Sequence, residues 1–273
     1  MSATRTFFFL CTIILFTGCI GRQAFYVSPF NGLNNPYHTI PLQKDSLRSA
    51  FYANGALAFG SANDYGGDKT FAANGNLSHS LNFGDFQAFY GIGFSAGSYK
   101  VDMFETQGNN ETVNPGIINA NAGKKNFSGY GFDGGINYVV PFENGEWRVI
   151  GFETSVYKES GSYLKFREIL PDSAATLIIR NHVFATAGGY SEIIGQTSKF
   201  SYGFKLGIGT VLGGAYHVRS IIDSDITRNG RLSYNYGNLT LHFSKNNFTG
   251  FAQFNVAAKA SSFMMGANYR LGK

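Results

Sequence analysis

The sequence has few charged residues, and those it has do not cluster. Only 14% of the 273 residues are Asp, Glu, Lys or Arg, whereas soluble globular domains carry about 25%. This shortage argues against an exterior that is solvated on all sides. The 22 Lys and Arg residues give a net charge of +5, but they are scattered and form no basic run or helical face that could follow a nucleic-acid backbone. Nucleic acid is therefore not an expected partner.

Long apolar runs are also missing. No segment after residue 18 approaches the roughly 20 apolar residues of a membrane-spanning helix. Mean hydropathy is -0.09, a value that looks neutral because apolar and polar residues alternate. Such alternation hides a transmembrane strand from a window average. The sequence thus argues against a helical membrane domain and leaves a membrane β-barrel open.

Cysteine is nearly absent, and its two positions are informative. Cys11 lies within the apolar stretch FFFLCTIILF at 7–16, which follows Arg5, and Cys19 follows the small residues at 17–18. A basic start, a short apolar core and small residues are typical of a secretory signal peptide. Removal of residues 1–18 would leave Cys19 as the only cysteine, so the mature chain could form no internal disulfide.

The segment LFTGC at 15–19 resembles the lipobox of bacterial lipoproteins. The resemblance implies that Cys19 is acylated and becomes the first residue of the mature protein. Phe16 stands where an aliphatic residue is usual, and an ordinary signal peptide is the alternative. Ile20 after the cysteine implies, by the same resemblance, that the lipoprotein is forwarded to the outer membrane.

Residues 19–48 are predicted to form a periplasmic tether. Three prolines, Pro29, Pro36 and Pro41, interrupt the segment, which has neither strand alternation nor a helical period. Aromatic residues such as Phe30 and Tyr37 are unusual in a flexible spacer. Two alternatives therefore stand: the segment is disordered, or part of it packs against the inner end of the barrel or enters its lumen.

Residues 49–273 are predicted to form one β-barrel. In 71–82, Phe71 and Leu77 share one face of a strand while Asn76 and Ser80 share the other. A wall between lipid and a wet lumen produces this pattern. In 231–243 the pattern requires a bulge at Gly237. About ten strands are predicted, within a range of about 8 to 12, at 49–60, 71–82, 86–98, 127–140, 146–158, 181–193, 200–212, 231–243, 248–259 and 263–271.

The connections between these strands alternate in length. Those at 83–85, 141–145, 194–199 and 244–247 are short, and those at 61–70, 99–126, 159–180 and 213–230 are longer. Outer-membrane barrels have short periplasmic turns and long outer loops. The pattern predicts an antiparallel up-and-down barrel with both of its ends, and a lipid on Cys19, at the periplasmic leaflet. The ninth connection, 260–262, is short and departs from the alternation.

The strand region resembles the β-barrel proteins of bacterial outer membranes. Gly266, Tyr269 and Leu271 resemble the final-strand signal read by barrel-insertion machinery, although Met264 replaces the usual polar residue. The abundance of Asn, Phe and Tyr is similar to that of barrels from Bacteroidota. The resemblance implies a Gram-negative outer membrane and contact with the insertion machinery during biogenesis. It names no activity.

Two groups of side chains are the candidate functional residues. Inward charges are expected to pair, because an unpaired charge in a narrow lumen is costly. Aromatic residues beside the short turns are expected to form a periplasmic girdle at the membrane interface. The predicted lumen polar network is Asp133, Glu153, Glu192, Lys205, Lys259 and Arg270, and the predicted girdle is Tyr138, Trp147, Phe200, Phe248 and Tyr269.

Patterns that carry chemistry are sparse. His79 lies between Ser78 and Ser80, but neighbours on a strand face opposite ways, so His79 cannot activate either hydroxyl as a general base. The five histidines are dispersed, without the spacing of metal ligands. No metal, no cofactor and no enzymatic activity are predicted. A lipid hydrolase of the outer membrane, using Ser80 or His182, is an alternative.

Barrels of about eight strands are filled by side chains, and open channels occur at sixteen or more. Ten strands therefore predict a largely filled lumen, in which inward glycines leave room for larger neighbours, the tether or a small ligand. The expected role is structural or interactive: a membrane anchor, a platform for loops, or an accessory subunit of an envelope complex, in contact with the lipid bilayer and with envelope proteins. A narrow pore for small solutes is one alternative function. A soluble lipoprotein barrel with an apolar interior is the alternative fold.

Overall fold

The computed structural model describes residues 24–30, 34–43, 48–63, 67–103, 114–212, 216–219, 227–230, 234–257 and 259–272. The predicted signal peptide and Cys19 lie outside these residues. Within them, no helix is both long enough and apolar enough to cross a membrane.

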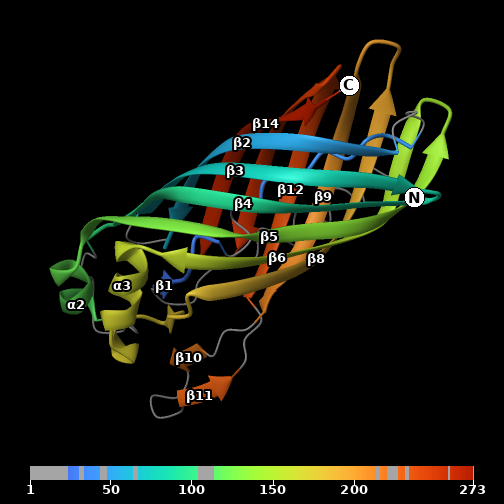
Figure 1. Ribbon diagram of the computed structural model, residues 1–273. Coiled ribbons are helices and arrows are strands. Elements are labelled where there is room, and N and C mark those ends of the chain that lie inside the picture. Colours follow the sequence, from blue (N-terminus) through green and yellow to red (C-terminus); the bar gives the residue numbers. More distant parts are fainter. Residues whose placement is uncertain are drawn as a thin grey trace, which may run out of the picture.

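Ten strands close into one barrel (Figure 1). Each pairs antiparallel with the next in the chain, and the last pairs with the first. This confirms the predicted ten-stranded up-and-down barrel, with strand ends that differ by a few residues. The strands are β2 (Ser49–Ala62), β3 (Asp68–Phe83), β4 (Phe86–Val101), β5 (Gly123–Phe142), β6 (Gly145–Ser160), β8 (Val183–Gln196), β9 (Ser201–Leu212), β12 (Tyr234–Lys245), β13 (Phe248–Ala257) and β14 (Ala260–Leu271).

The two faces of the wall differ in polarity as the alternation predicts. Leu77 and Phe132 are 54% and 68% exposed on the outside. Asn76 and Ser80, which alternate with Leu77 on β3, are 3% and 0% exposed inside. An apolar outer surface around a polar interior is the arrangement of a transmembrane barrel. The alternative of a soluble barrel with an apolar interior is therefore wrong.

Among the described barrel strands, one bulge interrupts the alternation, and it lies on β6. Tyr138 of β5 pairs with Ile150, and the next residue of β5 pairs with Arg148, so Val149 has no partner on β5. An extra residue of this kind reverses the parity of a strand. Arg148 is consequently buried in the lumen although Phe152, at the same parity, faces outward.

The bulge predicted at Gly237 is absent. Pairing of β12 with both β9 and β13 runs through this residue without a shift of register. Tyr236 is therefore on the inner face, where it is 4% exposed. The prediction fails because a large aromatic side chain on this strand was expected to face lipid, whereas Tyr236 lies over Gly209, which has no side chain to obstruct it.

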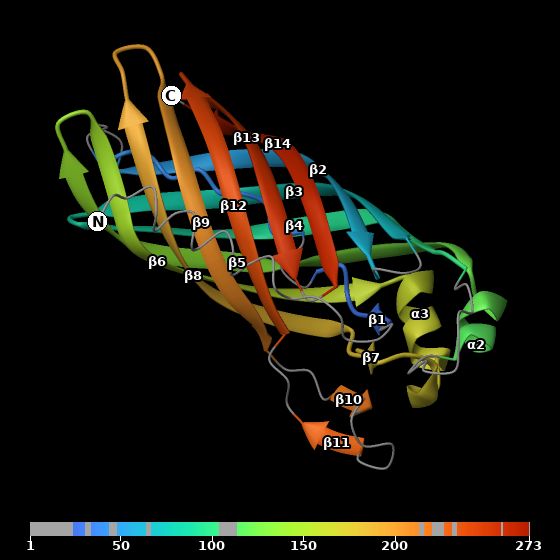
Figure 2. The same cartoon turned by 180° about the vertical axis from the view of Figure 1, so that it is seen from behind.

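The two ends of the barrel are built differently. At the short-turn end, tight connections join the strands at 84–85, 143–144, 197–200 and 246–247, and both Ser49 and Leu271 lie there. At the opposite loop end lie α2 (Pro115–Ala120), α3 (Ser162–Ile169) and η1 (Asp172–Ala174). A small sheet of order β1-β7-β10-β11 lies there as well (Figures 1 and 2). Its strands are β1 (Phe25–Tyr26), β7 (Leu177–Ile178), β10 (Tyr216–Arg219) and β11 (Thr227–Gly230). The connection between β13 and β14 is also at the loop end but is short.

Aromatic side chains close the loop end. Tyr26 packs edge-on against Phe166 of α3 with ring centroids 5.2 Å apart. Tyr163, also on α3, stacks on Tyr99 of β4 at 4.1 Å. These contacts hold α3 over the barrel mouth, since each ring removes a large apolar area from water.

A fully buried ion pair fixes α3 to the wall. Arg167 Nη2 lies 2.6 Å from Glu159 Oε2 at the end of β6, and both side chains are excluded from solvent. Arg167 Nη1 also donates to the carbonyl of Ile179 over 2.8 Å. Because neither charge can reach water, each depends on the other.

Replacing Glu159→Gln should therefore loosen the loop end by about 3–5 kcal/mol, because Arg167 keeps a buried charge without its counter-charge. The measurement is the rate of limited proteolysis at the loop end of the folded protein in detergent micelles. Asp172→Asn is the matched control: it removes an ion pair with Arg180 that is partly solvated and should cost at most about 1 kcal/mol. Equal proteolysis rates for the two variants would contradict the assignment.

Candidate functional site

The lumen is occupied by the chain's own amino-terminal residues, the described parts of 24–43, which we call the lumen segment. At the loop end, Phe25 N donates to Asn63 Oδ1 over 2.8 Å, and β1 pairs in parallel with β7. At the short-turn end, Gln43 Nε2 donates to the carbonyl of Gly84 over 2.6 Å. The segment therefore crosses the whole barrel. Of the two alternatives for residues 19–48, the described parts follow the second, and the expected periplasmic tether is corrected accordingly.

Wall side chains hold the segment through its backbone. Outside β1 it pairs with no strand, so its buried carbonyl groups need other donors. Polar residues on the inner faces of five strands supply them at successive levels of the lumen. The donor-acceptor pairs are Gln253 to Asn35 O (2.8 Å), Asn54 to Tyr37 O (2.9 Å), Ser80 to Thr39 O (3.1 Å), Arg148 to Ile40 O (3.0 Å) and Gln87 to Pro41 O (3.0 Å).

A glycine in the wall makes space for the segment near the loop end. Phe30 lies against Gly129 of β5, where an added Cβ would come within 2.6 Å of its ring. The same ring stacks on Tyr157 with centroids 5.6 Å apart. The wall is thus shaped to the aromatic side chains of the segment, as expected for inward glycines that leave room for a filler.

Arg148 is at the centre of the charged cluster near the short-turn end. Its side chain is 0% exposed. Its Nη1 lies 2.7 Å from Glu192 Oε2 on β8, and its Nη2 lies 2.9 Å from Glu146 Oε1 on its own strand. One guanidinium thus compensates two buried carboxylates and also binds Ile40 of the segment. A planar group with five donors is suited to such a position.

The two carboxylates also bind the lumen segment directly. Glu192 Oε1 accepts from the hydroxyl of Tyr37 over 2.7 Å and lies 2.8 Å from His242 Nε2. Glu146 Oε2 accepts from the backbone N of Gln43 over 2.6 Å. Wall and segment therefore form one polar network rather than two.

A second charged group lies further along the lumen. Lys205 Nζ contacts Glu153 Oε2 at 2.5 Å and lies 4.0 Å from the centre of the Tyr190 ring. Asp133 Oδ2 accepts from Asn76 over 2.7 Å, and its Oδ1 lies 3.6 Å from His38 Nε2 on the segment. Four residues of the predicted network, Asp133, Glu153, Glu192 and Lys205, are thus brought into the lumen.

The other two predicted members lie elsewhere. Lys259 is in the tight connection between β13 and β14, with a positive φ of 57°, and so belongs to the loop end. Arg270 Nη2 donates to Asn247 Oδ1 in a turn at the short-turn end. The alternating pattern predicts that the side chains of Lys259 and Arg270 point inward. It does not predict how far along the barrel axis each residue lies.

The five aromatic residues of the predicted girdle all lie on the outer surface near the short turns. Phe200 packs on Phe243 with centroids 5.0 Å apart, and Phe248 pairs with Tyr269 across β13 and β14. The indole N of Trp147 donates to Ser191 over 2.9 Å. Tyr138, Trp147, Phe200, Phe248 and Tyr269 are each between 38% and 52% exposed.

The residues considered for hydrolysis are not brought together. Ser80 lies in the lumen and donates to the lumen segment, whereas His182 is exposed at the loop end, where its carbonyl accepts from Glu159 N. His79 is on the outer face, 2.9 Å from the hydroxyl of Tyr90. Among the described residues, no group of three or more His, Cys, Asp or Glu side chains could hold a metal ion.

The chain is a transmembrane β-barrel whose lumen holds its own amino-terminal segment. No family model and no curated protein matches the sequence. An outer membrane channel from Pseudomonas putida F1 is similar in structure, with 10% identity over 87% of this chain and 99% of that chain and a TM-score of 0.44. The translocator domain of the autotransporter NalP from Neisseria meningitidis shares 10% identity over 84% and 91%, with a TM-score of 0.39. Likenesses this weak carry no functional argument.

Arg148→Leu should destabilise the protein by about 3–5 kcal/mol, because two carboxylates stay buried without a counter-charge. The measurement is the midpoint of denaturant-induced unfolding in detergent, followed by circular dichroism. The same substitution combined with Glu146→Gln and Glu192→Gln should recover part of the loss, since the uncompensated charge is then gone. A triple variant that is less stable than Arg148→Leu would contradict this account.

Proposed function

We propose that this protein is an outer-membrane β-barrel lipoprotein with a closed lumen and a structural or interaction role. It acts as a membrane anchor, a platform for the structures at the loop end, or an accessory subunit of an envelope complex. The occupied lumen is the observation that supports this role most directly. A barrel whose interior is filled with a hydrogen-bonded segment works through its outer surface and its two ends. Its partners are the lipid bilayer, the barrel-insertion machinery during biogenesis, and other envelope proteins.

The apolar outer surface and the amino-terminal signal support the location. Exposed Leu, Ile, Phe and Val side chains surround the barrel, and only lipid covers such a surface favourably. Closed barrels of this kind belong to the outer membranes of Gram-negative bacteria. The predicted signal peptide supplies the route of export.

The pore alternative requires the lumen segment to move. The cavity between His38 and Lys205, beside the segment, measures only about 20 Å³, space for about one water molecule. Nearer the short-turn end, the buried side chains of Tyr37 and Arg148 each bind one carboxylate oxygen of Glu192. A solute would have to displace contacts that compensate buried charge, which favours a closed barrel over a conducting one.

In planar bilayers the full-length protein should give no current steps above those of the lipid alone. A variant that lacks residues 24–43 should conduct, provided that it keeps the heat-modifiable migration of a folded barrel, because the lumen then contains only wall side chains and water. If the full-length protein conducts steadily, and as well as the deletion variant, the closed-barrel proposal is wrong and the protein is a pore.

The direction of the segment decides where the chain before it emerges. Ala24 is at the loop end: its carbonyl accepts from Thr176 N over 2.9 Å, and the neighbouring Phe25 binds Asn63, which follows the last residue of β2. Apolar residues on the outside of β2 end at Phe59, below that level. Beside β2, the lumen segment therefore begins beyond the last exposed large apolar residue of the wall.

Chain length then limits the position of Cys19. Five backbone steps separate Cys19 from Ala24, and an extended chain spans at most about 18 Å over five residues. The apolar band of such a barrel is about 25 Å tall, so this chain is too short to reach the opposite leaflet. The closed wall also blocks a sideways exit for acyl chains. The lumen segment thus favours a lipid on Cys19 in the leaflet at the loop end, and we propose this position as an alternative to the periplasmic-leaflet anchor expected from the sequence.

The position of the amino terminus can be measured on intact cells with a membrane-impermeant maleimide. Gln23→Cys should be labelled, as should the loop-end control Ser173→Cys, because long loops of outer-membrane barrels face the outside. The short-turn control Ser198→Cys should be labelled only after the outer membrane is permeabilised. If Gln23→Cys, like Ser198→Cys, is labelled only after the outer membrane is permeabilised, the terminus is on the periplasmic side. Incorporation of labelled fatty acid, lost in Cys19→Ala, tests acylation separately.

A further inference from the structure

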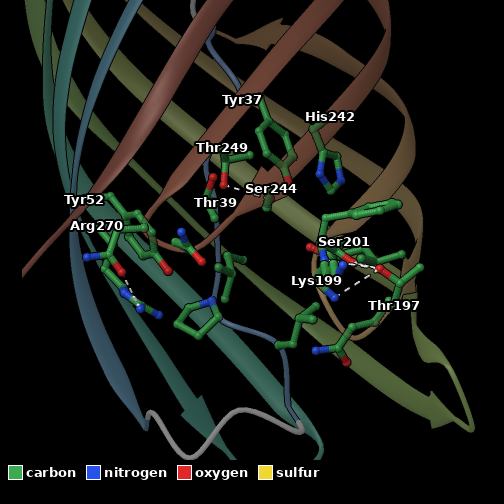
Figure 3. A pocket seen from close by; sticks show the side chains of 18 of the residues that line it. Tyr37, Thr39, Tyr52, Thr197, Lys199, Ser201, His242, Ser244, Thr249 and Arg270 are labelled. Atoms are coloured by element: carbon green, nitrogen blue, oxygen red, sulfur yellow. Dashed lines mark hydrogen bonds between the residues drawn. The ribbon is translucent and has the colours of Figure 1, made fainter. Parts of the chain in front are cut away.

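A cavity of about 220 Å³ opens at the short-turn end, between the wall and the last described residues of the lumen segment. Thr39, Ile40, Pro41 and Leu42 of the segment form one side. The turns at 197–200 and 246–247 and the side chain of Arg270 also line it, with Arg270 and Lys199 on different sides (Figure 3). Since one water molecule needs only about 10–15 Å³, the cavity has room for a small polar group together with several waters. We call it the short-turn vestibule.

The charge of the vestibule has one sign. Arg270 and Lys199 line it from different sides (Figure 3), and none of the described residues that line it is Asp or Glu. Glu192 is not among the lining residues and is already in contact with Tyr37, His242 and Arg148. Two cations without a facing carboxylate favour an anion.

The lining also has unused hydrogen-bonding capacity. The hydroxyl of Thr39 and the Nε of Arg270 are both buried and have no hydrogen-bond partner in the described structure. Arg270 is held by its Nη2 contact with Asn247 Oδ1, so its remaining donors are fixed in place. Buried donors without partners are rare in native proteins, and acceptor groups in the vestibule would satisfy them.

We propose that the short-turn vestibule binds a phosphate group, either free or as the headgroup of a phospholipid. Phosphate carries several acceptor oxygens on different sides, which suits a cavity whose donors come from the wall, a turn and the lumen segment. Arg recognises such oxygens with its planar fork and Lys with a point charge. Because Thr39 belongs to the segment, a bound phosphate would also contact the segment at its exit from the lumen.

The test uses the full-length protein in detergent micelles, titrated with inorganic phosphate by calorimetry at constant ionic strength. Arg270→Gln and Lys199→Gln should each weaken binding about tenfold, which corresponds to about 1.4 kcal/mol, since each removes a charge-assisted hydrogen bond. Lys245→Gln is the matched control, because Lys245 is exposed at the same end and does not line the vestibule. Lys199 is on an exposed turn, so its variant tests the site even where Arg270→Gln fails to fold.

Two sources of the phosphate give different results. A lipid headgroup is the ligand if inorganic phosphate does not bind but native mass spectrometry shows a bound phospholipid. This phospholipid should be retained by the wild-type protein and by Lys245→Gln, and lost in Arg270→Gln and Lys199→Gln. Absence of both forms of binding, or equal weakening by Lys245→Gln, would overturn the proposal. Neither result bears on the closed lumen, which the conductance measurement tests independently.

Discussion

The contacts of Arg148 are the constraint on which the occupied lumen depends. This one guanidinium joins β6 to β8 through Glu192, binds Glu146 on its own strand, and donates to Ile40 of the lumen segment. With the side chain fully excluded from solvent, each of these contacts replaces water that the charge would otherwise need. The wall and the segment are therefore not independent structures: the segment helps to satisfy charges of the wall, and side chains of the wall bind carbonyl groups of the segment.

The barrel itself could be predicted because its signal is local and repeated. Alternation on β3, where Leu77 faces out and Asn76 faces in, depends only on the period of a strand between two solvents. Ten repeats of this pattern, joined by tight turns at one end, leave few topologies other than a closed up-and-down barrel. A resemblance to outer-membrane barrels agreed with that expectation, but the residues of the strands were sufficient to predict the fold.

The site could be predicted only in part, because it depends on features that alternation does not encode. Arg148 has the parity of a lipid-facing residue, and only the bulge at Val149 turns it inward. Lys259 and Arg270 have the inward parity but lie at opposite ends of the barrel. The lumen segment has no period at all, since it is held by single contacts from separate strands. Its prolines and aromatic residues indicated that it was not a simple spacer, without indicating its route.

This route couples closure of the barrel to placement of the segment. Residues 24–26 are fixed at the loop end and Gln43 at the short-turn end, from which the chain continues into β2, the strand that pairs with β14 to close the wall. Closure around an empty lumen would bury Arg148 without Ile40 and Glu192 without Tyr37. Unmet hydrogen bonds to buried charged groups cost more than those to neutral ones. Pairing of β2 with β14 is consequently more favourable when the lumen segment is inside the barrel than when the lumen is empty. The buried polar groups of the lumen thus stabilise the closed barrel that contains the segment.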